Sequence, residues 1–209
     1  MHQVDDLAGQ AVAYVQRALG ITLGYDSETL PVLDHYISTV PRDRPEMIEL
    51  VTVTAGAYLG EVVRRQIGGR WEMDNPAQAM SWRLVLPTGL NFSPMGFVAA
   101  AIVGDELGDV DTAFDAPPAM LPYVEVTLGN MSEQSDQEYY SLCGRYDTLA
   151  HLHEVLVAVA ASRLDAVEAA QEAADEAVAD EPPAEASTQG AAGSPVRGAG
   201  TKPPGGPWN

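Results

Sequence analysis

Cysteine, lysine and long apolar runs are all scarce in this chain of 209 residues. Cys143 is the single cysteine, so neither an internal disulfide nor a thiolate metal cluster can form within one chain, and a reducing compartment is expected. The longest apolar stretch, residues 96–104, is far shorter than the roughly 20 residues of a membrane-spanning helix. The start of the sequence contains two acids and no base, unlike a secretory signal. We therefore expect a soluble cytoplasmic protein.

Basic residues are also few, 11 against 30 acidic ones, which gives a formal net charge of −19. Such a surface repels the phosphate backbone of nucleic acids and the headgroups of anionic membranes, so neither is an expected partner. A basic protein is the partner that this charge favours. Lys202 is the only lysine while alanine is abundant, a usage typical of GC-rich bacterial genomes.

The composition changes near residue 164. Residues 1–163 hold every Phe and Tyr, and carry 22 acids against nine bases, enough for one globular domain with a core. Residues 164–180 are acidic and Ala-rich, with apolar residues at helical spacing, and predict an extension of the last helix. Residues 181–209 are rich in Pro and Gly and predict a disordered tail.

The most informative segment is a predicted helix over residues 45–67. Its first half is apolar on nearly every face, which indicates a helix buried at the centre of the domain. Gly56 and Gly60 lie four residues apart and expose bare backbone, so a neighbouring element is expected to approach closely there. Each glycine costs a helix up to about 1 kcal/mol relative to alanine, so we expect packing to compensate.

Other patterns predict the remaining elements. Helices are expected after Asp5 and Asp6, after Asp26, over 95–104 and over 120–131, and short strands over 70–74, 80–87, 90–92 and 139–143. A last helix is expected to begin at Asp147. Helices therefore precede and follow a small antiparallel sheet of three to four strands, and the predicted fold class is α+β.

One group of charged and aromatic side chains gathers around the end of the long helix: Glu61, Arg64, Arg65, Arg70 and Trp71. Arginines and tryptophans in a concave site can hold an anionic or planar ligand. The same residues can instead form an ion cluster that fixes the helix end against the sheet, and this is the interpretation that we favour. Both interpretations stay open at this point.

Other candidate sites are weaker. His151 and His153 lie about 160° apart on a helical wheel and cannot share one metal ion. The acidic segment 105–115 lacks the calcium-loop register, and we interpret it as a solvated connection, with a weak divalent-cation site as the alternative. Cys143 is interpreted as core filler, although a dyad with a histidine stays open. No catalytic residue, metal or cofactor is predicted, and the sequence favours a non-enzymatic function over an enzymatic one.

Two motifs carry a resemblance. The run 57–61 (Ala-Tyr-Leu-Gly-Glu), followed by Arg64 or Arg65 and by 69–71 (Gly-Arg-Trp), resembles a pattern in uncharacterised bacterial domains. In that pattern a long helix ends in Gly-Glu-x-x-x-Arg and is followed by a Gly-x-Trp strand. Segments 138–140 and 144–146 resemble the end of such domains. The resemblance covers residues 20–160 and implies no activity, because none is assigned to the group. Small acidic bacterial proteins of this type imply, by analogy, toxin-immunity or secretion-accessory partners.

Three functional hypotheses follow. The leading one is a non-enzymatic acidic interaction module, of immunity or adaptor type, that binds a basic protein. The alternative is a ligand-binding domain or an enzyme with a pocket at Glu61, Arg64, Arg70 and Trp71. The third is a subunit of an assembly anchored through the tail, where Trp208 docks in an aromatic-lined groove of the partner.

Overall fold

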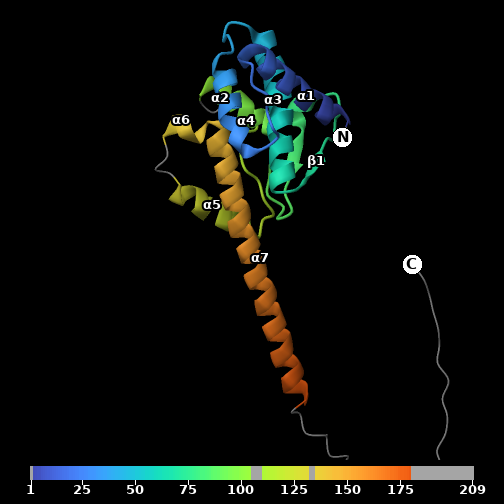
Figure 1. Ribbon diagram of the computed structural model, residues 1–209. Helices are drawn as coiled ribbons and strands as arrows, with labels where there is room; N and C mark the ends of the chain where they lie inside the picture. The colour runs from blue at the N-terminus through green and yellow to red at the C-terminus, as the bar shows by residue number, and fades with distance from the viewer. Residues whose placement is uncertain (1, 105–109, 132–134, 180–209) are drawn as a thin grey trace, which may run out of the picture. The chain divides into compact units, whose positions relative to one another are not determined.

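The computed structural model describes residues 2–104, 110–131 and 135–179, in which helices pack on a small sheet (Figure 1). The α-helices are α1 (His2–Leu19), α2 (Leu30–Ser38), α3 (Pro45–Gln66), α4 (Pro94–Val103), α5 (Leu121–Asn130), α6 (Asp136–Tyr139) and α7 (Leu142–Ala179). The strands are β1 (Arg70–Glu72), β2 (Arg83–Val85) and β3 (Asn91–Phe92). The predicted α+β class, with helices packed on a small antiparallel sheet, is confirmed.

Helix α3 occupies the core, as its sequence predicts. Every residue from Val51 to Val63 except Val53 is buried, because α1 packs on one part of its surface and α4 on another (Figure 1). Helix α1 contributes an apolar stripe at helical spacing, made by Val4, Ala8, Ala11 and Val15. Helix α3 thus has packing partners around most of its circumference.

The two glycines of α3 are points of close approach by neighbouring elements. A Cβ atom on Gly56 would lie 2.8 Å from the Cα atom of Met95 in α4. A Cβ on Gly60 would lie 2.3 Å from two ring atoms of Trp71. The expectation that these positions admit a neighbouring element is confirmed, since any side chain there would collide with it.

The sheet has the order β1-β2-β3, and both pairs are antiparallel. Trp71 lies opposite Leu84, and Leu84 in turn lies opposite Phe92. Trp82, Leu84 and Leu86 are buried on one side, but Val85, between the last two, is buried as well, so burial does not alternate along β2 as the sequence predicts. The strands are shorter than the sequence predicted, and residues Ala79–Ser81 form a 3₁₀ turn instead of the start of β2.

Three local predictions are wrong. Asp5 and Asp6 lie within α1, which begins at His2. The expected strand over 139–143 is absent from this described part of the chain, because α6 ends at Tyr139 and α7 begins at Leu142. Asp147 therefore lies inside α7 and does not cap it.

The first amide groups of α7 are hydrogen-bonded by one residue close in sequence and one far from it. The carboxylate of Asp34, in α2, accepts the amide N–H groups of Leu142 and Cys143 at 2.8 and 3.1 Å. Ser141 Oγ accepts the N–H of Gly144 at 2.9 Å, an ordinary N-cap contact. A distant carboxylate and a local hydroxyl together satisfy the first free amides of the helix.

The chain divides into two units, Met1–Ala166 and Val167–Asn209. The polar clusters and the groove described below lie in the first. Helix α7 continues to Ala179, and the predicted disordered tail, residues 181–209, lies outside the described residues. None of the helices in the described ranges combines the length and apolar character needed to cross a bilayer.

Candidate functional site

Glu61 is the centre of the predicted cluster. It lies on the last turns of α3 and is only 2% exposed. Arg64 donates to both of its carboxylate oxygens, from Nε to Oε1 and from Nη2 to Oε2, at 2.8 Å each. The indole N–H of Trp71, at the start of the sheet, donates to Oε1 at 3.0 Å. The carboxylate therefore joins the end of α3 to β1.

Arg65 is the fourth member of the cluster and contacts both Glu61 and Tyr25. Its Nε lies 3.5 Å from Glu61 Oε2, and its guanidinium carbon lies 3.9 Å from the centre of the Tyr25 ring. Tyr25 in turn packs on Tyr58 of α3, with ring centroids 4.9 Å apart. Arg65 is thus held by one ion pair and one cation–π contact, although nearly half of its side chain is exposed.

These contacts set the protonation state of Glu61. Burial on its own raises the pKa of a carboxyl group, but the hydrogen bonds from Arg64 and Trp71 and the two positive charges outweigh it, and the pKa of Glu61 falls below its ordinary value. Glu61 is therefore an anion at neutral pH. For Arg64, the hydrogen bond to Glu61 raises the pKa of the guanidinium.

Arg70 does not join the cluster. Its side chain is 69% exposed and pairs with Glu72, on the same strand, at 2.7 Å. The structure therefore brings together four of the five residues that the sequence grouped, namely Glu61, Arg64, Arg65 and Trp71. Their contacts are those of the ion-cluster interpretation, and ligand binding at this position stays a prediction.

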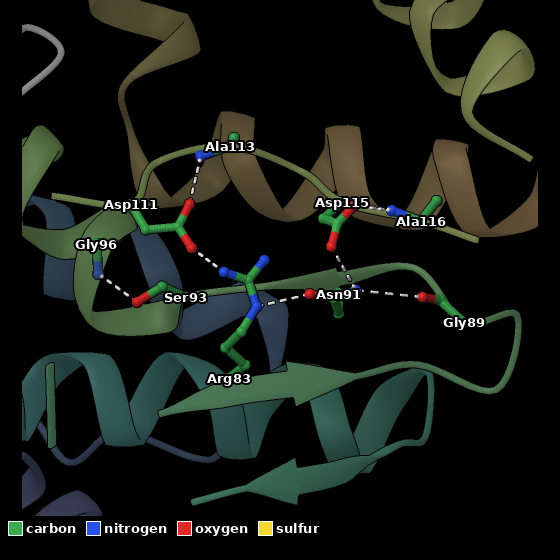
Figure 2. Close-up of polar contacts among 9 residues, drawn as sticks. All are labelled: Arg83, Gly89, Asn91, Ser93, Gly96, Asp111, Ala113, Asp115 and Ala116. Atoms are coloured by element: carbon green, nitrogen blue, oxygen red, sulfur yellow. Dashed lines mark hydrogen bonds and ion pairs between the residues drawn. The ribbon is translucent and has the colours of Figure 1, made fainter. Parts of the chain in front are cut away.

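A second polar network fixes residues Asp111 and Asp115 to the sheet. Figure 2 shows Arg83 of β2 between Asn91 and Asp111: its Nε donates to Asn91 Oδ1 at 2.6 Å and its Nη1 pairs with Asp111. Asn91 and Asp115 exchange backbone hydrogen bonds of 2.7 and 2.9 Å. The acidic segment was predicted to be a solvated connection, and at these two acids it is bonded to the sheet.

Beside this network lies a groove of about 630 Å³. Its walls come from α3, from the turn before β2 and from the segment that begins at Val110. The lining residues are Glu49, Val53, Ala77, Gln78, Ala79, Met80, Ser81, Val110 and Asp111. Met80 is a large apolar side chain left 39% exposed, and the Asp111 side chain is 43% exposed. Apolar side chains and two carboxylates therefore line the same groove, and sequence spacing alone did not group them.

The structure places the remaining candidate residues from the sequence as follows. His151 is exposed, and His153 lies 3.2 Å from the hydroxyl of Thr88. Burial raises the pKa of the Cys143 thiol to about 12, with Asp34 adding to the shift. Trp208 lies outside the described residues. Over the described ranges, no group of three or more His, Cys, Asp or Glu has the arrangement of a metal site.

One residue escaped the sequence analysis. Arg145, on the first turn of α7, is fully buried, and aromatic side chains surround its guanidinium. The available signal was the density of tyrosines at 139, 140 and 146 around a lone base.

Comparison with protein-family models, with curated proteins and with solved structures finds no match to this chain.

Proposed function

We propose that this chain is a protein-interaction module, not an enzyme, and that the groove beside Asp111 receives a basic, partly apolar segment of a partner protein. The observation that carries the proposal is that two carboxylates, Glu49 and Asp111, and an exposed apolar side chain, Met80, line one groove of about 630 Å³. Carboxylates next to apolar surface complement a segment that alternates Arg or Lys with apolar residues.

The two carboxylates differ in how they are held. Asp111 is fixed, because Arg83 pairs with it and the backbone N–H of Ala113 donates to its Oδ1 at 3.2 Å (Figure 2). Glu49 is exposed on α3 and has no ion pair among the described residues. A partner cation would therefore gain most from Glu49, while Asp111 gives the groove a rigid acidic edge.

The net charge supports the same class of partner. A charge of −19 attracts a basic protein from a distance and accelerates the encounter, and salt weakens that effect. The Glu61 cluster contributes little to such binding, because Arg64, Arg65 and Trp71 already occupy its carboxylate. Immunity or adaptor roles are both compatible with this mode of binding, and we propose them as the broader setting.

The test uses a defined probe. A fluorescein-labelled amphipathic peptide of 15 residues or so, built from Arg and Leu, is titrated with the full chain and followed by anisotropy at low and high salt. We expect saturable binding that weakens as salt is added, and no binding of the same peptide with Glu in place of Arg.

Two variants with the same net charge locate the binding. Glu49→Lys places a positive charge in the groove and should weaken binding about tenfold, or about 1.4 kcal/mol. Glu125→Lys makes the same change on the exposed surface of α5, away from the groove, and should have a much smaller effect. Equal losses in both variants would show attraction by net charge alone, and absence of binding to the basic peptide would overturn the proposal.

A further inference from the structure

Helix α7 carries a row of apolar side chains that the rest of the described chain leaves largely exposed. Val157, Leu164 and Val167 are 49%, 64% and 67% exposed, and we call these three residues the α7 stripe. They follow one another at intervals of seven and three residues, so they lie along one face of the helix. One turn before Val157 the same face meets the fold, where His153 lies 3.2 Å from the hydroxyl of Thr88. A row of large apolar side chains in contact with water is typical of an interaction surface.

The spacing of the α7 stripe is that of a coiled-coil seam. Val157 and Leu164 take the a positions of consecutive heptads, and Ala160 and Val167 take the d positions. In a coiled coil, each a or d side chain inserts between four residues of a facing helix. The occupant that this seam fits is therefore another helix, lying alongside α7 at a small crossing angle.

The charges beside the stripe indicate which helix that is. In the same heptads Arg163 is at position g and Glu168 is at position e, on opposite flanks of the stripe, and both residues are exposed. The other acids between residues 157 and 172 are Asp165 and Glu172, and both are at position b, away from the seam. One positive and one negative charge therefore border the seam, and the seam is complementary to a second copy of itself.

Arg163 and Glu168 do not meet each other within one helix. They are five residues apart and thus separated by about 140° around the helix axis. Neither has a residue of opposite charge three or four positions away, the spacing at which side chains of one helix meet. Arg163 donates from Nη2 to the carbonyl of Ala119 at 3.1 Å. That bond uses one of the five N–H donors of the guanidinium, so the exposed side chain can also bind a carboxylate.

Two copies of α7 side by side would satisfy both charges. In a parallel pair of helices, a residue at position g faces the e residue that comes five positions later on the other helix. Two α7 helices in register would therefore place Arg163 of each chain opposite Glu168 of the other, twice in the pair.

We propose that the α7 stripe is a dimerisation surface, on which a second copy of this chain lays its own α7 parallel and in register. The stripe residues of both chains are buried at the seam, and two pairs of Arg163 with Glu168 fix the direction of the helices. This surface is distinct from the groove at Glu49 and Asp111, so either proposal can fail without the other.

The net charge sets the conditions of the test. Two chains of charge −19 repel each other over long distances, whereas Arg163 and Glu168 attract in contact. At an ionic strength of about 0.15 M the screening length is about 8 Å, so salt weakens the distant repulsion more than the contact pairs. Sedimentation equilibrium of the full chain over a range of concentrations at this ionic strength should show a reversible equilibrium between monomer and dimer.

Two variants locate the dimer surface. Leu164→Gln should lower the association constant about 30-fold or more, because each dimer loses two leucines from the seam. Val126→Gln changes an apolar side chain of α5 that is 65% exposed, and should leave the association constant unchanged. Leucine and glutamine have similar helix propensities, so α7 should persist in the first variant, and circular dichroism checks this.

Charge variants test the parallel register. Arg163→Glu and Glu168→Arg each place like charges opposite one another in both pairs, so each variant alone should associate about tenfold more weakly. An equimolar mixture of the two variants should associate nearly as well as the unaltered chain, since each mixed dimer again has two pairs of opposite charge.

The outcomes are distinct. A chain that stays monomeric at every concentration would overturn the proposal, as would equal losses in Leu164→Gln and Val126→Gln. A mixture of charge variants that associates no better than its separate components would overturn the parallel register. A monomeric chain that binds a basic amphipathic peptide, and loses that binding in Leu164→Gln, would assign the stripe to a different protein and overturn the second copy as its occupant.

Discussion

Glu61 shows how one side chain can join two elements. Its carboxylate accepts from Arg64 on its own helix and from Trp71 on β1, and Arg65 adds a third contact. Because it is buried, losing the negative charge would leave two arginines facing a neutral group. The stability contributed by this residue is therefore tied to its ionised form.

A first prediction concerns the pH dependence of that contribution. Glu61→Gln should lower the free energy of unfolding at pH 7 by about 2–3 kcal/mol, since a buried carboxylate loses its charged hydrogen bonds while its arginine partners stay partly exposed to water. The pKa of Glu61 in the folded chain lies below its ordinary value of 4.5, so its stabilising effect is complete above that value and disappears as pH falls through the folded pKa. Urea unfolding of both proteins from pH 7 downwards measures the difference.

Glu72→Gln provides the control for this prediction. Glu72 pairs with Arg70, and both side chains are well exposed, so its loss should cost at most about 1 kcal/mol. A Glu61→Gln variant as stable as the parent chain at pH 7 would contradict the structural role of the cluster. A difference that persisted unchanged to the lowest pH would contradict the assigned pKa shift.

The Cys143 thiol gives a second prediction at this scale. Burial and the nearby Asp34 raise its pKa to about 12, well above its ordinary value of 9.0, so the thiol stays protonated in the folded chain at pH 8. Alkylation by iodoacetamide should be slow in the native state and rapid in urea, because the thiolate is the reactive form. Fast alkylation of the native chain would contradict this environment.

At the scale of elements, the close approach of Trp71 to α3 gives a third prediction. Gly60→Ala would place a Cβ 2.3 Å from the Trp71 ring, which Glu61 and Trp82 hold in place. We expect a loss of about 1–3 kcal/mol in unfolding free energy from overpacking. Gly9→Ala, in α1 where nothing lies within 4 Å, should instead gain up to about 1 kcal/mol from helix propensity. Thermal unfolding of both variants compares the signs, and a neutral or stabilising Gly60→Ala would contradict the packing.

The elements differ in how far the sequence could predict them. The apolar run of α3 and the alternation around Leu84 are local patterns, and they predicted the central helix and the sheet. The start of α7 depends on Asp34, more than 100 residues away, so no local pattern could place it there. The local signal that was missed is Ser141, whose spacing to Gly144 is that of an N-cap.

The candidate sites follow the same division. Glu61, Arg64 and Arg65 share one helix, so their spacing alone predicted that they meet. The groove at Glu49 and Asp111 assembles from segments far apart in the chain. Only the tertiary structure brings those residues together, and sequence reasoning without it could not group them.

For the whole molecule, the dominant feature is the excess of acidic residues. The chain has 30 acidic and 11 basic residues, so most of its negative charges have no positive partner. These negative charges repel one another more strongly when the chain is compact than when it is unfolded. We therefore predict that Tm rises as sodium chloride is increased from about 10 mM to about 500 mM, because salt screens that repulsion. A fall in Tm over this range, measured by calorimetry, would show that the ion pairs stabilise the fold more than the net charge destabilises it.

The location of a bound basic segment tests the proposed function most directly. With the ¹⁵N-labelled chain, adding the Arg- and Leu-containing peptide should shift the amide signals of residues 77–81, of Glu49 and Val53, and of the segment at Val110 and Asp111. The signals of Arg64 and Trp71 should stay in place. Shifts concentrated at the Glu61 cluster, or spread evenly over the acidic surface, would contradict a partner-binding role for this groove.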